Sequence, residues 1–334
     1  MKKTLIALAA VAATGAAFAQ SSVTLYGVAD ISVGDNNVAG SKFAASANGG
    51  GANAAGVGGV NNGNSRFGLR GTEDLGGGLK AGFNYEANVS LADGSACNLT
   101  TCAAGQAGLD TDLFQRAANV SLSGGFGSIT AGRQLNTAFR SVAAWELTGA
   151  ANYSAVAKQF SFAGKGSRND AMISYVTPNF GGVTVELGTV LKGNNAAGAL
   201  YDLAATYAAG PMVVSFNYNK LSATGAKANM AIGGKYNFGV ATVAASYQNL
   251  ESTKTATATA KKGVTLGVSA PVGPVILTAD MARATDTSNK STDYLLEAKY
   301  PLSKRTFVYG AYLNDATKGQ ATVKSWGLGV RHNF

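Results

Sequence analysis

The sequence predicts an all-β protein, a sixteen-stranded antiparallel transmembrane β-barrel, and three observations lead to this fold class. Segments of about ten residues with alternating apolar and polar side chains follow one another along the chain. The connections between these segments are alternately short and long. After the N-terminal segment there is no run of roughly 18 apolar residues, which excludes a helical membrane protein.

The chain begins with the features of a secretory signal. A basic start, Met1-Lys2-Lys3, precedes an apolar run from Thr4 to Ala13 and a small-residue site, Ala17-Phe18-Ala19. The run is shorter than the ~20 residues that a spanning helix needs, which argues against a membrane anchor. We therefore expect residues 1–19 to be a cleaved signal peptide, and residues 20–334 to form one exported barrel domain.

The composition differs from that of a soluble domain. Hydrophobic residues make up 46% of the chain, whereas charged residues make up only 13%, about half of their usual share. The chain contains 44 Gly and 5 Pro. This composition predicts many short strands joined by glycine turns.

The clearest strand pattern lies between Leu79 and Leu91, where every second residue is apolar and the residues between are polar or glycine. Side chains alternate across a strand, so one face of this segment meets an apolar medium and the other meets water. A soluble β-sandwich would show the same alternation. The fold class therefore depends on the connections.

Seven short turns and eight longer connectors join the predicted strands, and the longest connectors are 34–63, 92–112 and 135–167. Tight periplasmic turns at one end and long extracellular loops at the other are typical of outer-membrane barrels, whose closure leaves no unpaired edge. About sixteen strands enclose an aqueous channel. The predicted strands are 22–33, 64–73, 79–91, 113–123, 128–134, 168–177, 182–192, 200–209, 212–221, 228–238, 240–250, 262–270, 275–285, 292–300, 305–314 and 322–334.

The last predicted strand ends on an aromatic side chain, Phe334. Its apolar face carries Trp326, Leu328, Val330 and His332. Aromatic residues are frequent at the membrane boundary, so we expect this strand to end flush at the periplasmic rim. Phe334 is the predicted assembly signal.

Four segments carry a resemblance to a known family: Ser21–Gly27 (SSVTLYG), Ser65–Gly76 (SRFGLRGTEDLG), Gly124–Gln134 (GGFGSITAGRQ) and Gly327–Phe334 (GLGVRHNF). In this order and spacing they resemble the trimeric general porins of Gram-negative bacteria, especially the β-proteobacterial and neisserial type. The resemblance implies a homotrimer in outer-membrane lipid and lipopolysaccharide, inserted by the barrel assembly machinery. It also implies a third extracellular loop, here 135–167, that folds into the lumen as a constriction.

The resemblance further implies a basic wall opposite this loop. By alignment the wall comprises Arg66, Arg116 and Arg168, with Arg70 on the same face as Arg66. Arg116 has the parity of the lipid-facing residues in its predicted strand. Either a bulge turns it to the lumen or it lies in the trimer contact.

The predicted acidic side of the constriction departs from the enteric pattern of several carboxylates. Glu146 is the only carboxylate of residues 135–167, which also contain Arg140, Lys158 and Lys165. Arg133 is a further expected pore charge. Net positive charge at a constriction favours anions, because low-dielectric walls focus its field on the pore.

The sequence thus predicts passive diffusion of small hydrophilic solutes with a preference for anions. A channel specific for organic acids or phosphate is one alternative, and a surface barrel that acts as an adhesin or phage receptor is another. We expect no enzyme activity, because the single histidine, His332, lies on the apolar face of the last strand.

We expect no cofactor and no metal. Cys97 and Cys102 are predicted to form a local disulfide after export. The net charge of +9 is spread along the chain without a basic run, so nucleic acid is not an expected partner.

Overall fold

A computed structural model describes residues 22–37, 60–91, 94, 113–160, 166–194, 198–251, 261–285, 290–316 and 318–334. The expected signal peptide, Cys97, Cys102 and Lys165 lie outside these residues. Within them, no helix has the length and apolar character that crossing a membrane requires.

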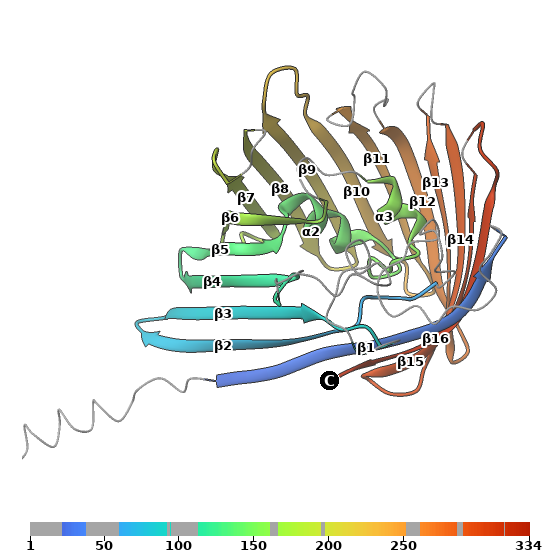
Figure 1. Ribbon diagram of the computed structural model, residues 1–334, viewed down its shortest axis with the longest axis horizontal. Coiled ribbons are helices and arrows are strands. Elements are labelled where there is room, and N and C mark those ends of the chain that lie inside the picture. The colour runs from blue at the N-terminus through green and yellow to red at the C-terminus, as the bar shows by residue number, and fades with distance from the viewer. Residues whose placement is uncertain are drawn as a thin grey trace, which may run out of the picture.

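Sixteen antiparallel strands form one closed barrel, in which each strand pairs with its neighbours in sequence and the first pairs with the last (Figure 1). This confirms the predicted fold class. The strands are β1 (Ser22–Asn36), β2 (Arg66–Gly76), β3 (Leu79–Asn88), β4 (Ala117–Gly124), β5 (Gly127–Leu135), β6 (Arg168–Val176), β7 (Val183–Val190), β8 (Ala199–Ala209), β9 (Met212–Ser222), β10 (Asn229–Asn237), β11 (Thr242–Leu250), β12 (Lys261–Val272), β13 (Val275–Ala284), β14 (Ser291–Pro301), β15 (Thr306–Asp315) and β16 (Val323–Asn333).

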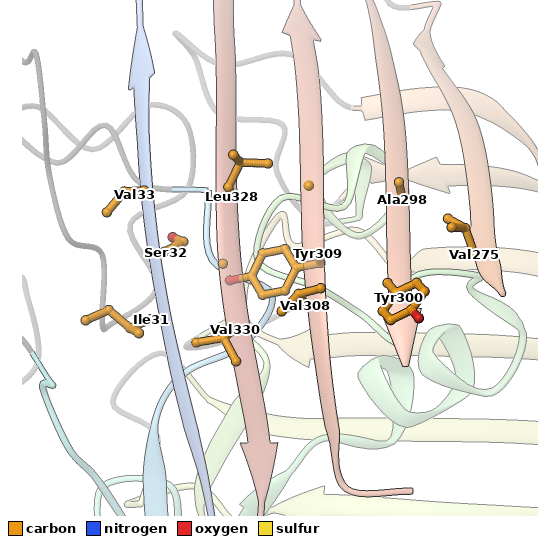
Figure 2. A pocket seen from close by; sticks show the side chains of 12 residues that line it. Ile31, Ser32, Val33, Val275, Ala298, Tyr300, Val308, Tyr309, Leu328 and Val330 are labelled. Carbon is orange, nitrogen blue, oxygen red and sulfur yellow. The ribbon is translucent and has the colours of Figure 1, made fainter. Parts of the chain in front are cut away.

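The outer face of the barrel is apolar. On β16, Leu328 is 58% exposed, whereas Ser325, an inward position on the same strand, is buried. Figure 2 shows this outer surface at a shallow hollow where Val33, Leu328 and Val330 lie side by side on β1 and β16. Apolar side chains outside and polar ones inside are the arrangement that lipid requires.

Backbone contacts of Phe334 extend the pairing of β1 with β16 that closes the barrel. Its N–H donates to the carbonyl of Gly27 at 3.1 Å, and the Gly27 N–H donates to the Phe334 carbonyl at 2.9 Å. A Cβ atom at Gly27 would lie 2.3 Å from Cζ of the Phe334 ring. Only glycine allows the ring to lie against β1 at this point.

One predicted strand boundary is wrong by four residues. The prediction began the fourth strand at residue 113, but β4 begins at Ala117, and residues 113–116 form a turn. Phe114 packs on Tyr85 with ring centroids 5.0 Å apart, and Arg116 bonds to Glu86. These side-chain contacts fix the turn before strand pairing starts.

Two short helices lie inside the barrel, on the chain between β5 and β6 (Figure 1). Helix α2 (Thr137–Trp145) contacts β7 to β10, and helix α3 (Ala155–Gln159) contacts β12 to β14. Asn136 caps α2 by accepting from the Phe139 N–H, and Ser154 caps α3 by accepting from the Ala157 N–H. The predicted insertion of the third loop into the lumen is confirmed.

Candidate functional site

The described part of the inserted loop, residues 136–160 and 166–167, covers the acidic part of the inner wall. Asp202, Asp280, Asp293 and Glu297 project inward from β8, β13 and β14, and each is between 3% and 6% exposed. The backbone of Thr137 in α2 bonds to Asp202, and the Tyr153 hydroxyl donates to Glu297. The loop therefore separates these carboxylates from the open lumen.

Ion pairs hold both helices of the loop against the wall. Arg140 of α2 pairs with Glu186 of β7, with Nε at 3.1 Å from Oε2. Lys158 of α3 pairs with Asp315 of β15 at 3.1 Å. Arg140 and Lys158, which were expected as secondary pore or loop charges, are therefore each paired with a carboxylate of the wall.

Glu146, expected at the constriction, is buried inside the loop. Its carboxylate accepts hydrogen bonds from the Thr148 hydroxyl, the Ala150 N–H and the Ser154 hydroxyl at 2.5, 2.5 and 2.6 Å. Buried polar groups need such partners, and here the turn between α2 and α3 supplies them. Glu146 therefore stabilises the fold of the loop and does not line the pore, which corrects the expectation that it lies at the constriction.

The opposite wall carries three arginines at one level. Arg66 begins β2, Arg168 begins β6, and Arg116 lies just before β4. Glu86 of β3 pairs with two of them, at 3.4 Å from Arg66 Nε and 2.5 Å from Arg116 Nε. Arg168 Nε donates to the Arg116 carbonyl at 3.0 Å. Two guanidinium groups thus bind one carboxylate and the third lies beside them, which leaves two positive charges in excess.

Arg116 faces the lumen although its parity in the expected strand predicted the outer face. Its Nη1 also donates to Asn88 at 3.2 Å, and Asn88 lies with Glu86 on the inner face of β3. The turn at 113–116 frees Arg116 from strand alternation, so neither a bulge nor a subunit contact is needed. Its side chain is 10% exposed, against 22% for Arg66, which leaves Arg66 more accessible to a solute.

The two other expected pore arginines have different surroundings. Arg70 is exposed and lies over the ring of Tyr26, 5.0 Å from the centroid. The Tyr26 hydroxyl in turn donates to Asn84 at 2.8 Å and to Glu86 at 3.0 Å. Arg133 pairs with Asp170 and donates to the Gln115 carbonyl, so its charge is compensated.

Sequence reasoning missed Asn62, a buried residue that links the loop to the wall. Its N–H donates to the Tyr309 hydroxyl at 2.9 Å, and its Nδ2 donates to the Tyr153 hydroxyl at 2.8 Å. Its backbone carbonyl accepts from Asn152 N–H at 3.1 Å, and its Oδ1 accepts from Arg331 at 2.7 Å. Every polar group of Asn62 is therefore used. No sequence signal distinguished it within the Gly/Asn-rich connector.

The Tyr153 hydroxyl connects Asn62 to Glu297 on strand β14. Burial, and then the neighbouring Glu297 carboxylate, raise the pKa of Tyr153 well above its ordinary value. The hydroxyl therefore keeps its proton and donates to Glu297. Lys299 completes this contact at 3.0 Å from Glu297 and also donates to the Thr148 carbonyl at 2.8 Å. The tip of the loop is thus tied to β14 and to residues 60–65.

The substitution Gly233→Ala is expected to displace helix α2 from the barrel wall. A Cβ atom at Gly233 would lie 2.3 Å from Cε2 of Trp145, a buried residue that packs edge-on against Phe160. Overpacking of this kind costs about 1–3 kcal/mol. We expect a lower thermal midpoint and altered single-channel conductance. Gly125→Ala is the control, because its Cβ meets open space, and equal behaviour of the two variants would contradict the packing role of Gly233.

Comparisons with known proteins agree with this architecture. A family model described as Gram-negative porin matches residues 4–320. Outer membrane porin protein 32 of Delftia acidovorans is 34% identical over 99% of this chain and 94% of its own length. An outer membrane porin protein of Bordetella pertussis is 30% identical over the full length of both. The solved anion-selective porin from Comamonas acidovorans superposes with a TM-score of 0.71 at 28% identity, over 94% of this chain and all of that one.

Proposed function

This chain belongs to the Gram-negative porin family, and on that premise we propose that its channel favours anions. Porins of this family reside in the outer membrane and pass small hydrophilic solutes by passive diffusion through a water-filled lumen, and this chain does the same. The observation that carries the proposal is the asymmetry of the lumen. The inserted loop covers the acidic wall, whereas on the opposite wall Arg66 and Arg168 stay partly exposed beside the buried Arg116.

The physical basis is the field at the constriction. Arg66, Arg116 and Arg168 lie within electrostatic range of one another, with Glu86 as the carboxylate between them. Positive groups along a narrow lumen lower the energy of a passing anion and raise that of a cation. The low-dielectric barrel wall and loop focus this field on the gap. The anion selectivity named for the Comamonas acidovorans relative supports the same proposal.

The proposal extends to assembly. We assign the chain a homotrimeric state in outer-membrane lipid and lipopolysaccharide, with insertion by the barrel assembly machinery and with Phe334 as the recognised end. A solved outer membrane protein of Vibrio cholerae with a similar fold is in a trimer form, and the backbone contacts of Phe334 extend the pairing of β1 with β16. Passage of solutes involves no covalent step, so the proposal assigns no catalysis.

The test is the reversal potential of the purified protein in a planar bilayer under a salt gradient. We expect the sign that anion preference gives, with a current that rises linearly with anion concentration. Cation preference would contradict the proposal. Saturation of the current by one organic acid or by phosphate would indicate a substrate-specific channel instead.

A further inference from the structure

Arg331 is a basic residue of the inner wall that stands apart from the three arginines around Glu86. It lies on β16 between Val330 and His332, which are exposed on the outer face, whereas Arg331 is half-buried on the inner face. It lies three residues before the last residue of the chain, which corresponds to about 10 Å along a strand. Its cross-strand partner, Phe307, is close to the periplasmic turn between β14 and β15. Arg331 therefore faces the periplasmic half of the lumen.

A single strand, β1, separates Arg331 from the arginine wall. The register of β1 places Asp30 opposite Arg331 and Val28 opposite Arg66. Neighbouring strands lie about 4.8 Å apart and each residue advances about 3.4 Å, so the backbones of Arg331 and Arg66 are roughly 12 Å apart. Both side chains are long and point inward, and the charge of Arg331 is within electrostatic range of Arg66 and Arg116. The field of Arg331 therefore adds to that of the wall.

The contacts of Arg331 leave its charge without a counter-ion. Its Nη1 donates to Asn62 Oδ1 at 2.7 Å, its Nε donates to Asn333 Oδ1 at 3.2 Å, and its guanidinium carbon lies 5.9 Å from the centre of the Phe307 ring. These partners are all neutral, and within the described part of the chain Arg331 has no ion pair. Arg140, by contrast, pairs with a carboxylate of the wall.

The carboxylate of Asp30, across the ladder from Arg331, is bound to other groups. Its Oδ1 accepts from the Tyr309 hydroxyl at 2.6 Å, and its Oδ2 accepts from the Gly63 N–H at 2.9 Å. Asp30 is fully buried beneath residues 60–65. It attracts Arg331 from a distance and forms no ion pair with it, so the guanidinium group stays available to a solute in the lumen.

Residues 60–65 hold this guanidinium group in one place. The hydrogen bond to Asn62 fixes one of its nitrogen atoms. A Cβ atom at Gly63 would lie 2.9 Å from Nη1 of Arg331, so a larger residue there would displace the group. A positive group that is already held in position needs little further ordering when an anion arrives.

We infer that Arg331 is a further selectivity-determining residue, which forms a second anion site on the periplasmic side of the constriction. The inference rests on the proposed anion preference. On β15, Tyr309, which contacts Asn62, lies two residues farther from the periplasmic turn than Phe307, the cross-strand partner of Arg331. An anion that has passed the inserted loop therefore next meets Arg331. Successive sites that each bind weakly favour conduction, because an ion can leave one site for the next.

The variant Arg331→Gln tests this site by the reversal potential of the full-length protein in a planar bilayer under a salt gradient. We expect the permeability ratio of anion to cation to fall about twofold, the effect of one charge about 8 Å from an ion in water after screening. Arg331→Lys keeps the charge and is expected to keep the ratio. The matched control is Arg305→Gln, which removes an exposed arginine from the turn between β14 and β15 and should leave the ratio unchanged.

Two further measurements separate the charge of Arg331 from its contact with Asn62. In the background of Asn62→Ala, where this contact is absent, Arg331→Gln is still expected to lower the ratio about twofold. The difference between Arg331→Gln and the unaltered protein should also shrink between 0.1 M and 1 M salt, because the Debye length falls from about 10 Å to about 3 Å. A loosened loop would give a difference that does not depend on salt.

If Arg331→Gln does not assemble, Asn333→Asp provides the same test. It places a carboxylate beside Arg331 Nε and should also lower the ratio about twofold. An unchanged ratio in these variants, with anion preference in the unaltered protein, would overturn this inference alone. So would equal shifts in Arg331→Lys or in Arg305→Gln, or the absence of any further shift in the Asn62→Ala background. Cation preference of the unaltered protein would instead contradict the proposed function.

Discussion

The double variant Arg66→Ala, Arg168→Ala is expected to lose most of the anion preference of the channel. It leaves Arg116 paired with Glu86, so the excess of two positive charges at the constriction falls to zero. Two charges about 8 Å from an ion change its energy by about 1 kcal/mol in water, and salt screening about halves this. Anions and cations shift in opposite directions, so the permeability ratio should change about fivefold.

The measurement is the reversal potential under a salt gradient, compared with a variant that loses the same charge elsewhere. Lys304→Ala, Arg305→Ala serves this purpose, because both residues lie in the periplasmic turn between β14 and β15. That variant should keep the ratio of the unaltered protein. If both variants shift the ratio equally, net charge rather than the arginine wall sets the selectivity.

The variant Asn62→Ala is expected to widen the size range of solutes that pass. It removes the side-chain hydrogen bonds to the buried Tyr153 hydroxyl and to the half-buried Arg331 guanidinium group. A lost hydrogen bond costs about 0.5–1.5 kcal/mol, and one to a charged group costs about 1.5–3 kcal/mol. The backbone contacts of residue 62 to Tyr309 and Asn152 remain, so the barrel should still assemble. We expect faster liposome swelling with larger sugars and more frequent fluctuations of the single-channel current.

A double-mutant cycle separates this role from a general loss of stability. Tyr153→Phe removes the other side of the same contact, so the effects of Asn62→Ala and Tyr153→Phe on swelling should be less than additive. Asn37→Ala is the control, because the Asn37 amide makes an exposed contact with the Thr322 carbonyl at 2.9 Å. Unchanged swelling in Asn62→Ala would show that other contacts suffice to hold the loop.

The barrel was predictable because strand alternation is a local property. Each side of Leu79–Asn88 can be assigned from neighbouring residues, and the turns set the order of the strands. The start of β4 was not predictable, because it depends on contacts of Phe114 and Arg116 with β3. Boundaries set by tertiary contacts do not appear in a period-2 pattern.

The candidate site was predictable in position but not in charge balance. The resemblance placed Arg66 and Arg168 on the wall, yet it could not show that Glu146 is enclosed by its own loop. Arg140 pairs with Glu186, a residue from another strand, and only the fold brings the two together. Asn62 was unrecognisable for the same reason, since its partners come from β15, β16 and the inserted loop.

One loop sets both the size limit and the charge preference of this channel, because it narrows the lumen and also covers Asp202, Asp280, Asp293 and Glu297. Ions reach direct contact with these carboxylates only when the loop leaves the wall. A loosened loop would therefore admit larger solutes and cations together, without any change in the arginines. Natural variation in the contacts of Asn62 and Tyr153 would thus change the permeability to ions and the permeability to bulky nutrients together. Selection for one of these two permeabilities would therefore also change the other.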